Sequence, residues 1–311
     1  MASYAFEKVA NETMFEWLTS PSDGQFKKAE DAINGYTRYR VREDGIHRRV
    51  MPFVDLPNDE LDRDHQEKPI KWVDREPDSP AAISVPFATL PENVYILGIR
   101  YPVKFHRVQT VNFTKDVDEL RTYHMDIRQV LSDNSIKDML YEEDVKFFGT
   151  VNRAMGGTVD TLAPWSGVYQ WRSVQGGTTR DGTREAFKIL PSGPTHLEVK
   201  TVVINNVTMQ EIMKWGRDEV GGDFSQDMMK NGYEETTFQK AQLIITIKTD
   251  LVPNDTMYMF PDEKFIGRAY TLDDTTMAVK REFFMINWFC YETIGSSIGN
   301  AASPTRADLA A

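Results

Sequence analysis

The side chains that could bind a metal ion are scattered along this sequence. Of its five histidines, no two stand at the spacing that places both on one helix face, and the HExxH zinc pattern does not occur. Oxygen-bearing residues between positions 223 and 234 follow the offsets of a calcium loop, but Met228 stands where the sharp turn requires glycine. The lone cysteine, Cys290, lies between two aromatic residues, which is typical of a small buried side chain. We therefore expect no metal ion and no cofactor.

The residues that could carry out catalysis form no recognisable set either. No serine lies in a G-x-S-x-G pattern, and Cys290 has no histidine near it in the sequence. The adjacent acids Glu142, Glu143 and Asp144 would fan around a helix axis instead of facing one another, so we interpret them as a solvated or subunit-facing charged patch. The glycine-rich stretch at 176–184 lacks the lysine of a phosphate-binding loop and is typical of a mobile surface loop. We expect no catalytic residues and no enzyme.

The composition describes an acidic globular protein. Its 311 residues suffice for about two domains of ~150 residues and for a sizeable core. With 41% hydrophobic and 27% charged residues the chain is not of the disordered class. No apolar run approaches the ~18 residues of a membrane-spanning helix, so we expect no membrane partner. The net charge of −11 disfavours tight binding of nucleic acid, which depends on lysine and arginine neutralising phosphates.

Residues 38–80 predict a long β-hairpin. Apolar residues from Ile46 to Val54 mark one limb, apolar residues from Ile70 to Val73 mark the other, and acidic residues form the tip between them. An isolated two-stranded hairpin is marginally stable in water, and this one has too few apolar side chains for a core of its own. We therefore expect the hairpin to lie on another surface, for which a neighbouring copy of the chain is the nearest source.

The N-terminal half otherwise alternates between helix and strand patterns. Helical spacing in residues 1–36 predicts two short helices, and alternating apolar residues at 83–113 predict strands. An apolar stripe predicts a long helix from an N-cap at Asp126 to about Ala154.

The C-terminal half mixes short strands and helices. A strand at 197–204 precedes a helix at 208–215, and the last quarter is rich in β-branched and aromatic residues with turns predicted at 253–255 and at Asp273-Asp274. Because strands and helices interleave without a repeating βαβ rhythm, the sequence favours the α+β class.

Three blocks of the sequence, taken in order, resemble the major capsid protein of tailed double-stranded DNA bacteriophages, whose Hong Kong 97 fold is shared with encapsulin shells. The first block is the pair of hairpin limbs VREDGIHRRVMP and PIKWVDREPDSPAAISVPF. The second is YPVKFHRVQTVNFTKDVDELRTYHMDIRQVLSDNSIKDMLYEEDVKFF, and the third runs from TIKTDLVPNDTMYMF to YETIG. The resemblance spans most of residues 36–299 and rests on the order, spacing and texture of these blocks.

The resemblance implies a Hong Kong 97-like capsid fold of the α+β class, with boundaries that follow the predicted elements. The implied parts are an N-terminal arm at 1–37, an extended β-hairpin loop at 38–83, a peripheral domain with a long spine helix at 84–159 and 276–299, an axial domain at 160–275 and a C-terminal tail at 300–311. In this family the extended loop lies over the adjacent subunit, which would supply the surface that the predicted hairpin lacks.

The function that the resemblance implies is structural. The chain would be a subunit that self-assembles, as pentamers and hexamers, into the icosahedral head shell of a tailed bacteriophage. The partners implied are other copies of the chain, with scaffolding, portal and cement proteins, and the shell would enclose double-stranded DNA without sequence-specific binding. An acidic chain suits a wall that holds DNA without binding it. The resemblance places the protein in the virion capsid, after assembly in the host cytoplasm.

The surplus of charge and shortage of core in the hairpin single out residues that we expect to contact neighbouring copies. These residues are Arg48, Arg49, Asp59, Glu60, Asp62, Arg63, Asp64 and Trp72. Some relatives cross-link a loop lysine to an asparagine of the next subunit through a buried glutamate. Lys68 and Lys71 are present in the hairpin, but no partner is evident and we assume no such bond.

Two alternatives remain open. One is an encapsulin-type compartment shell with the same fold. The other, from a different class, is a cytoplasmic α+β enzyme or carbohydrate-binding domain that uses Trp165, Tyr169 and Trp171, although aromatic residues at such spacing more often belong to a core.

Overall fold

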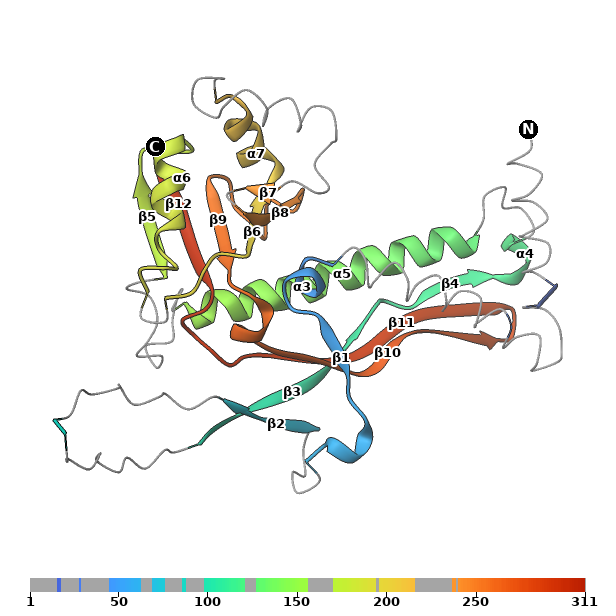
Figure 1. The fold of residues 1–311 in the computed structure, drawn as a ribbon. Coiled ribbons are helices and arrows are strands. Elements are labelled where there is room, and N and C mark those ends of the chain that lie inside the picture. The colour runs from blue at the N-terminus through green and yellow to red at the C-terminus, as the bar shows by residue number, and fades with distance from the viewer. Residues whose placement is uncertain are drawn as a thin grey trace.

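Two β-sheets and one long helix dominate the fold (Figure 1). The computed structural model describes residues 16–17, 28, 45–62, 69–75, 86–87, 98–120, 127–155, 170–193, 196–215, 237–238 and 240–310. Within them the first sheet has the strand order β1-β10-β11-β3-β2, with β4 paired to β11, and the second has the order β5-β12-β9-β6-β8-β7. Sheets of mixed strand direction with helices placed between strands confirm the predicted α+β class.

The first sheet is built on a long antiparallel hairpin of β10, Gly267–Glu282, and β11, Met285–Ile298. The predicted strand-rich C-terminal block is therefore confirmed, but the turn predicted at Asp273-Asp274 is wrong. Strand β10 passes through Asp273, where the register shifts on both sides of this residue, and the chain reverses at Phe283 instead. A β-bulge can absorb extra residues without ending a strand, so turn-forming residues there bend the strand and do not close a hairpin.

Two further strands lie along β11, and two short strands complete the edges. Strands β3, Ile99–Gln109, and β4, Phe113–Asp116, pair with successive parts of β11. Strand β2, Ile70–Arg75, pairs with β3, and β1, Phe53–Asp55, runs parallel to β10.

These pairings correct the hairpin predicted over residues 38–80, because in the described parts of its limbs β1 and β2 pair with other strands, and an isolated bridge joins Asp62 to Ile70. The first limb contains a short helix, α3, Ile46–Val50, in which Ile46 and Val50 are both buried. Their separation of four residues is a helical spacing, and both side chains belong to the core cluster that contains Phe147 and Val151 of the long helix. A 3-10 turn, η1, Asn58–Glu60, follows β1.

The long helix α5 spans Ile127–Ala154 and confirms the predicted spine helix. It lies beside the first sheet and reaches toward the second (Figure 1). Its buried side chains include Met139, Leu140, Phe147 and Val151, which recur at helical spacing. A short helix, α4, Val117–Leu120, follows β4.

The second sheet is buried on both faces at its central strands β6 and β9. Its strands are β5, Trp171–Gln175; β6, Thr201–Asn205; β7, Thr237–Phe238; β8, Ala241–Thr246; β9, Thr256–Phe260; and β12, Thr305–Ala310. Alternate residues of β9 serve two cores: Tyr258 and Phe260 pack in the cluster with α5, whereas Met257 and Met259 pack in the cluster with the short helices. Burial on both faces explains why β6 and β9 read as continuous apolar runs.

Two short helices cover that second face. Helix α6, Arg180–Phe187, is capped by Thr179, and α7, Asn206–Met213, is capped by Asn205. The predicted helix at 208–215 and strand at 197–204 are confirmed apart from their ends, whereas the predicted surface loop at 176–184 ends in α6. Another 3-10 turn, η2, Glu263–Phe265, precedes β10.

The predicted C-terminal tail at 300–311 is also corrected. Strand β12 lies inside the second sheet, parallel to β5 and antiparallel to β9. Ala307 and Leu309 are buried there. The residues that resemble a loose tail in the sequence therefore form a strand between β5 and β9. Among the described helices, none is both long and apolar enough to cross a bilayer.

Candidate subunit-contact surfaces and a buried ion cluster

The pair of strands β2 and β3 forms a two-stranded ribbon that extends away from the helix and the second sheet (Figure 1). Among the strands of the described residues β2 pairs with β3, from Ile70 opposite Lys104 to Arg75 opposite Ile99, and an isolated bridge joins Ile70 to Asp62. Trp72 is 46% exposed in the isolated chain. The outer ion pair of the ribbon, Arg100 with Asp74, is also exposed, whereas Ile70 and Val103 near its inner end are buried. The outer part of the ribbon therefore has the shortage of core that the sequence predicted for a hairpin.

Four of the predicted contact residues come together where β2 begins. Asp62 accepts a hydrogen bond from Trp72 Nε1 at 2.7 Å, and Glu60 accepts one from Lys71 at 2.6 Å. Asp59 is exposed beside them. Acidic side chains of the predicted tip thus bind residues of their own chain at the surface. Arg63 and Asp64 lie outside the described residues, as does Lys68.

Arg48 lies inside the subunit, unlike the other described members of the predicted contact set. Its Nε and Nη2 atoms each donate to Glu143 at 3.0 Å, and Nη2 also donates to Glu292 at 2.9 Å. The Arg48 side chain is 7% exposed and both carboxylates are fully buried. We therefore remove Arg48 from the proposed contacts, while its neighbour Arg49 is exposed and remains among them.

The interpretation of the acidic triplet as a charged patch holds only for Glu142, because Glu143 and Asp144 are fully buried. The signal for this was present in the sequence. Glu143 and Asp144 stand four residues after Met139 and Leu140, and four before Phe147 and Phe148, so they continue the buried stripe of α5.

The two buried glutamates differ in protonation. Burial and the nearby negative charge of Glu143 raise the pKa of Glu292 to about 9, even though Arg48 opposes the shift. Burial also acts to raise the pKa of Glu143, but the charge and hydrogen bonds of Arg48 outweigh it and hold that pKa below its usual value. Thr275 on β10 donates a hydrogen bond to Glu292 at 2.9 Å. At neutral pH Glu143 is therefore the ionised partner of Arg48, and Glu292 carries a proton.

A third buried carboxylate, that of Asp144, connects helix α3 to the region after β8. Asp144 accepts a hydrogen bond from the His47 backbone N–H at 3.0 Å and another from Lys248 Nζ at 2.6 Å. The His47 ring stacks on Phe147 with centroids 4.5 Å apart. Burial lowers the pKa of His47 to about 4, so the ring is neutral at physiological pH.

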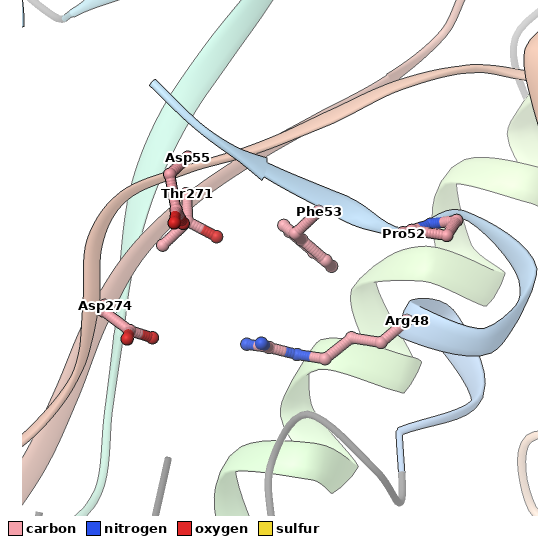
Figure 2. A pocket seen from close by; sticks show the side chains of 6 residues that line it. All are labelled: Arg48, Pro52, Phe53, Asp55, Thr271 and Asp274. Atoms are coloured by element: carbon pink, nitrogen blue, oxygen red, sulfur yellow. The ribbon is translucent and has the colours of Figure 1, made fainter. Parts of the chain in front are cut away.

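A pocket of about 280 Å³ opens beside this cluster. Figure 2 shows the Arg48 guanidinium directed toward Asp274, with Phe53 close to it. The Arg48 Cζ atom lies 4.8 Å from the Phe53 ring centroid. The lining residues are Arg48, Pro52, Phe53, Asp55, Thr271 and Asp274. They include neither a histidine nor a cysteine, and their arrangement offers no nucleophile paired with a base.

The other candidates from the sequence have no chemical site in the described part of the chain. There, no three histidine, cysteine or acidic side chains gather as metal ligands. The calcium-loop offsets at 223–234 lie outside the described residues, and so do Trp165 and Tyr169. Trp171 holds the Arg306 guanidinium 4.4 Å from its ring centroid and donates a hydrogen bond to Asp308. Cys290 is fully buried, as predicted.

Comparison with solved structures finds the same fold in capsid shells. The mature capsid of bacteriophage PhiM1 matches with a TM-score of 0.57 at 7% identity, over 86% of this chain and 87% of the other. A chain of the structure of Mycobacterium phage Ogopogo matches with a TM-score of 0.57 at 11% identity, over 86% of this chain and 92% of the other. A virus-like particle from Pyrococcus furiosus matches at 0.54 and 10% identity, over 89% and 98%.

These likenesses extend over most of each chain at very low identity, so they define the fold. No protein-family model matches the sequence, and the curated proteins contain no significant match. The chain therefore has the Hong Kong 97-like capsid fold that its sequence blocks resemble.

Proposed function

We propose that this protein is the structural subunit of an icosahedral head shell of a tailed bacteriophage. The observation that carries the proposal is the match of nearly the whole chain to subunits of capsid shells, with no large part left over for another activity. A shell requires many modest contacts that close under symmetry, and a subunit with projecting elements suits that requirement.

The β2–β3 ribbon is the element that we assign to contact with a neighbour. It replaces the hairpin of residues 38–83 as the extended loop, because β2 pairs along its length with β3, whereas its contact with the segment before it is an isolated bridge from Ile70 to Asp62. The half-exposed Trp72 would supply the apolar anchor on the next subunit, since buried tryptophans often dominate interfaces. We also keep as proposed contacts the charged residues Arg49, Asp59, Glu60, Asp62, Arg63 and Asp64.

The remaining parts follow from the same assignment. The first sheet and α5 would form the peripheral domain, and the second sheet, which includes β12, would form the axial domain around symmetry axes. Residues 1–37 would form an N-terminal arm. We propose assembly as pentamers and hexamers in the host cytoplasm, with scaffolding, portal and cement proteins as partners and double-stranded DNA enclosed without sequence-specific contacts.

A compartment shell is the second candidate, and it is favoured by the match to the virus-like particle from Pyrococcus furiosus. The two candidates share the subunit contacts and differ in what the shell holds. Nucleic acid inside the purified particles supports the head shell, whereas enclosed protein without nucleic acid supports the compartment.

Negative-stain microscopy and sedimentation of the purified chain test the proposal. We expect closed particles or their pentameric and hexameric precursors, with or without co-expressed partner proteins. A chain that stays monomeric or dimeric under all such conditions contradicts both shell candidates. That outcome favours an enzyme or a carbohydrate-binding domain.

A further inference from the structure

The buried ion cluster contains two acidic side chains and one basic side chain. Glu143 and Glu292 both face the single guanidinium of Arg48, and both carboxylates are fully buried. If both were ionised, one buried carboxylate would lack a counter-charge. Two acids that share a buried site therefore retain one proton between them.

The hydrogen bonds of Glu292 fit a bound proton. Its Oε2 atom accepts from Arg48 and from Thr275, at 2.9 Å each. Its Oε1 atom is buried and accepts no hydrogen bond from the protein. A protonated carboxyl is a donor, and the Glu143 carboxylate beside Glu292 is an acceptor, so a proton on Glu292 provides a hydrogen bond between the two side chains.

The cluster also joins segments that are distant in sequence. Arg48 lies on α3, Glu143 on α5 and Glu292 on β11, while Thr275 lies on β10. Segment 45–55, which contains α3 and β1, pairs with the first sheet through three residues of β1, and Ile46, Val50 and Met51 pack in the core cluster with α5. The polar contacts of α3 add to this packing, so a change in their charge shifts the balance between the attached and the open segment.

We propose that Arg48, Glu143 and Glu292 form a proton-dependent latch: a proton shared by the two carboxylates holds segment 45–55 against α5 and β11, and loss of that proton to solvent releases the segment. The latch is a property of the single chain, so it stands or falls independently of the proposed shell.

Other charged groups surround the latch on every packed element. They are His47 on α3, Glu142, Asp144 and Lys146 on α5, His106 on β3, Asp274 on β10 and Lys248 after β8. Lys248 binds Asp144, and burial lowers the pKa of both His47 and His106. Both histidines are therefore already neutral at pH 7 and lose no proton above it. A change between pH 7 and 9 consequently reports on the carboxylates.

The direction of the pH effect follows from linkage. The pKa of Glu292 is about 9 in the closed latch and returns toward its ordinary value of 4.5 when the segment opens and the carboxyl meets water. Opening therefore releases one proton between these two values. The opening equilibrium rises by up to about tenfold per pH unit in this window and levels off above it.

Hydrogen exchange followed by mass spectrometry of the full chain, from pH 6.5 to 9.5, tests the latch. Intrinsic amide exchange also accelerates with pH, so the measured quantity is the exchange rate of peptide 45–56 divided by that of a peptide from β8, Ala241–Thr246. We expect this ratio to rise with pH, approaching tenfold per unit, and to flatten near pH 9. A ratio that does not change overturns the proposal.

The variant Glu292→Gln distinguishes the effect of the bound proton from the effect of side-chain packing. Glutamine has nearly the shape of a protonated glutamate but cannot release a proton, so we expect peptide 45–56 to stay protected and its ratio to lose the pH dependence. The matched control Glu282→Gln alters an exposed glutamate of β10 and keeps the wild-type slope. A Glu292→Gln chain with the wild-type slope also overturns the proposal, and if this variant does not fold, the wild-type titration decides alone.

Discussion

Arg48 and Glu292 are 244 positions apart in the sequence, and the Arg48 Nη2 atom lies 2.9 Å from Glu292 Oε2. Together with Glu143 this contact joins the start of the described chain to the C-terminal hairpin through the long helix. Desolvating three ionisable groups offsets most of their mutual attraction, so such a cluster contributes more to fixing one arrangement of segments than to net stability. Removing Arg48 alone, however, leaves a buried carboxylate without its charged partner.

Arg48→Met tests the cost of removing one member of this cluster. We expect the free energy of unfolding to fall by about 3–5 kcal/mol at neutral pH, because the buried Glu143 loses the guanidinium that compensates its charge. Chemical denaturation followed by circular dichroism measures the change. The control Lys188→Ala breaks an exposed ion pair with Glu185 and should cost less than about 1 kcal/mol. Equal effects of the two substitutions would contradict the burial of the Arg48 cluster.

The elements that the sequence predicted well are those with a local signal. The stripe of α5 and the β-rich C-terminal block repeat over many residues, so neighbouring positions support the same assignment. Glu143 and Asp144 were misinterpreted because their charge was given more weight than their place in that stripe. Burial of an acid depends on whether a partner such as Arg48 or Lys248 is available, and both partners are about 100 residues away.

The strand pairings were beyond local reasoning. The order of β2 and β3 in the ribbon depends on β11, which holds β3 in place from the far end of the chain. The segment at 46–54 has apolar residues that suit a strand or a short helix equally well, and only the surface of α5 decides between them. Likewise, the small residues of β12 resemble a tail in the sequence, and their strand conformation depends on pairing with β5 and β9.

His47→Phe tests the effect of the buried imidazole on acid stability. Burial lowers the pKa of His47 from 6.5 to about 4, so the unfolded chain binds more protons than the folded chain between these values. This histidine therefore removes stability as the pH falls through that window, by up to about 3 kcal/mol. Both ring nitrogens lack hydrogen-bond partners, so phenylalanine loses no bond and keeps the stacking on Phe147.

Urea unfolding at pH 7 and at pH 4.5 measures this effect. We expect His47→Phe to lose less stability than the wild type between the two pH values. The control His196→Gln replaces an exposed histidine and should retain the wild-type difference. An unchanged pH dependence in His47→Phe would show that the ring is charged in the folded chain.

Trp72→Ala tests the proposed contact of the ribbon with a neighbouring subunit. The indole is half exposed in the single chain, so we expect little loss of subunit stability. If the indole is buried in the assembly, its loss costs about 2 kcal/mol per contact and raises the concentration needed for assembly by more than tenfold. Sedimentation across a dilution series measures that concentration. Phe265→Ala, at a similarly exposed aromatic residue away from the ribbon, should change it less.

Phe283 at the turn of the β10–β11 hairpin has a φ of 54°, in the left-handed region that favours glycine. Phe283→Gly should therefore stabilise the chain by about 1 kcal/mol, because its exposed ring contributes little packing that could be lost. Thermal unfolding measures the gain. Phe284→Gly is the matched control, since Phe284 is also exposed but does not have a positive φ. Equal effects at both positions would mean that the turn does not hold Phe283 in this conformation.

Gly295 on β11 and Gly149 on α5 respond to a methyl group in opposite ways. A Cβ atom at Gly295 would lie 2.9 Å from the Phe105 ring and 3.1 Å from the Lys104 carbonyl oxygen on the paired strand β3. Gly295→Ala should therefore destabilise the chain by about 1–3 kcal/mol. A Cβ atom at Gly149 would meet nothing within 4 Å, so Gly149→Ala should stabilise the helix by about 1 kcal/mol through propensity alone. Denaturation of both variants side by side checks the pairing of β11 with β3, because a tolerant Gly295 would require these strands to lie further apart.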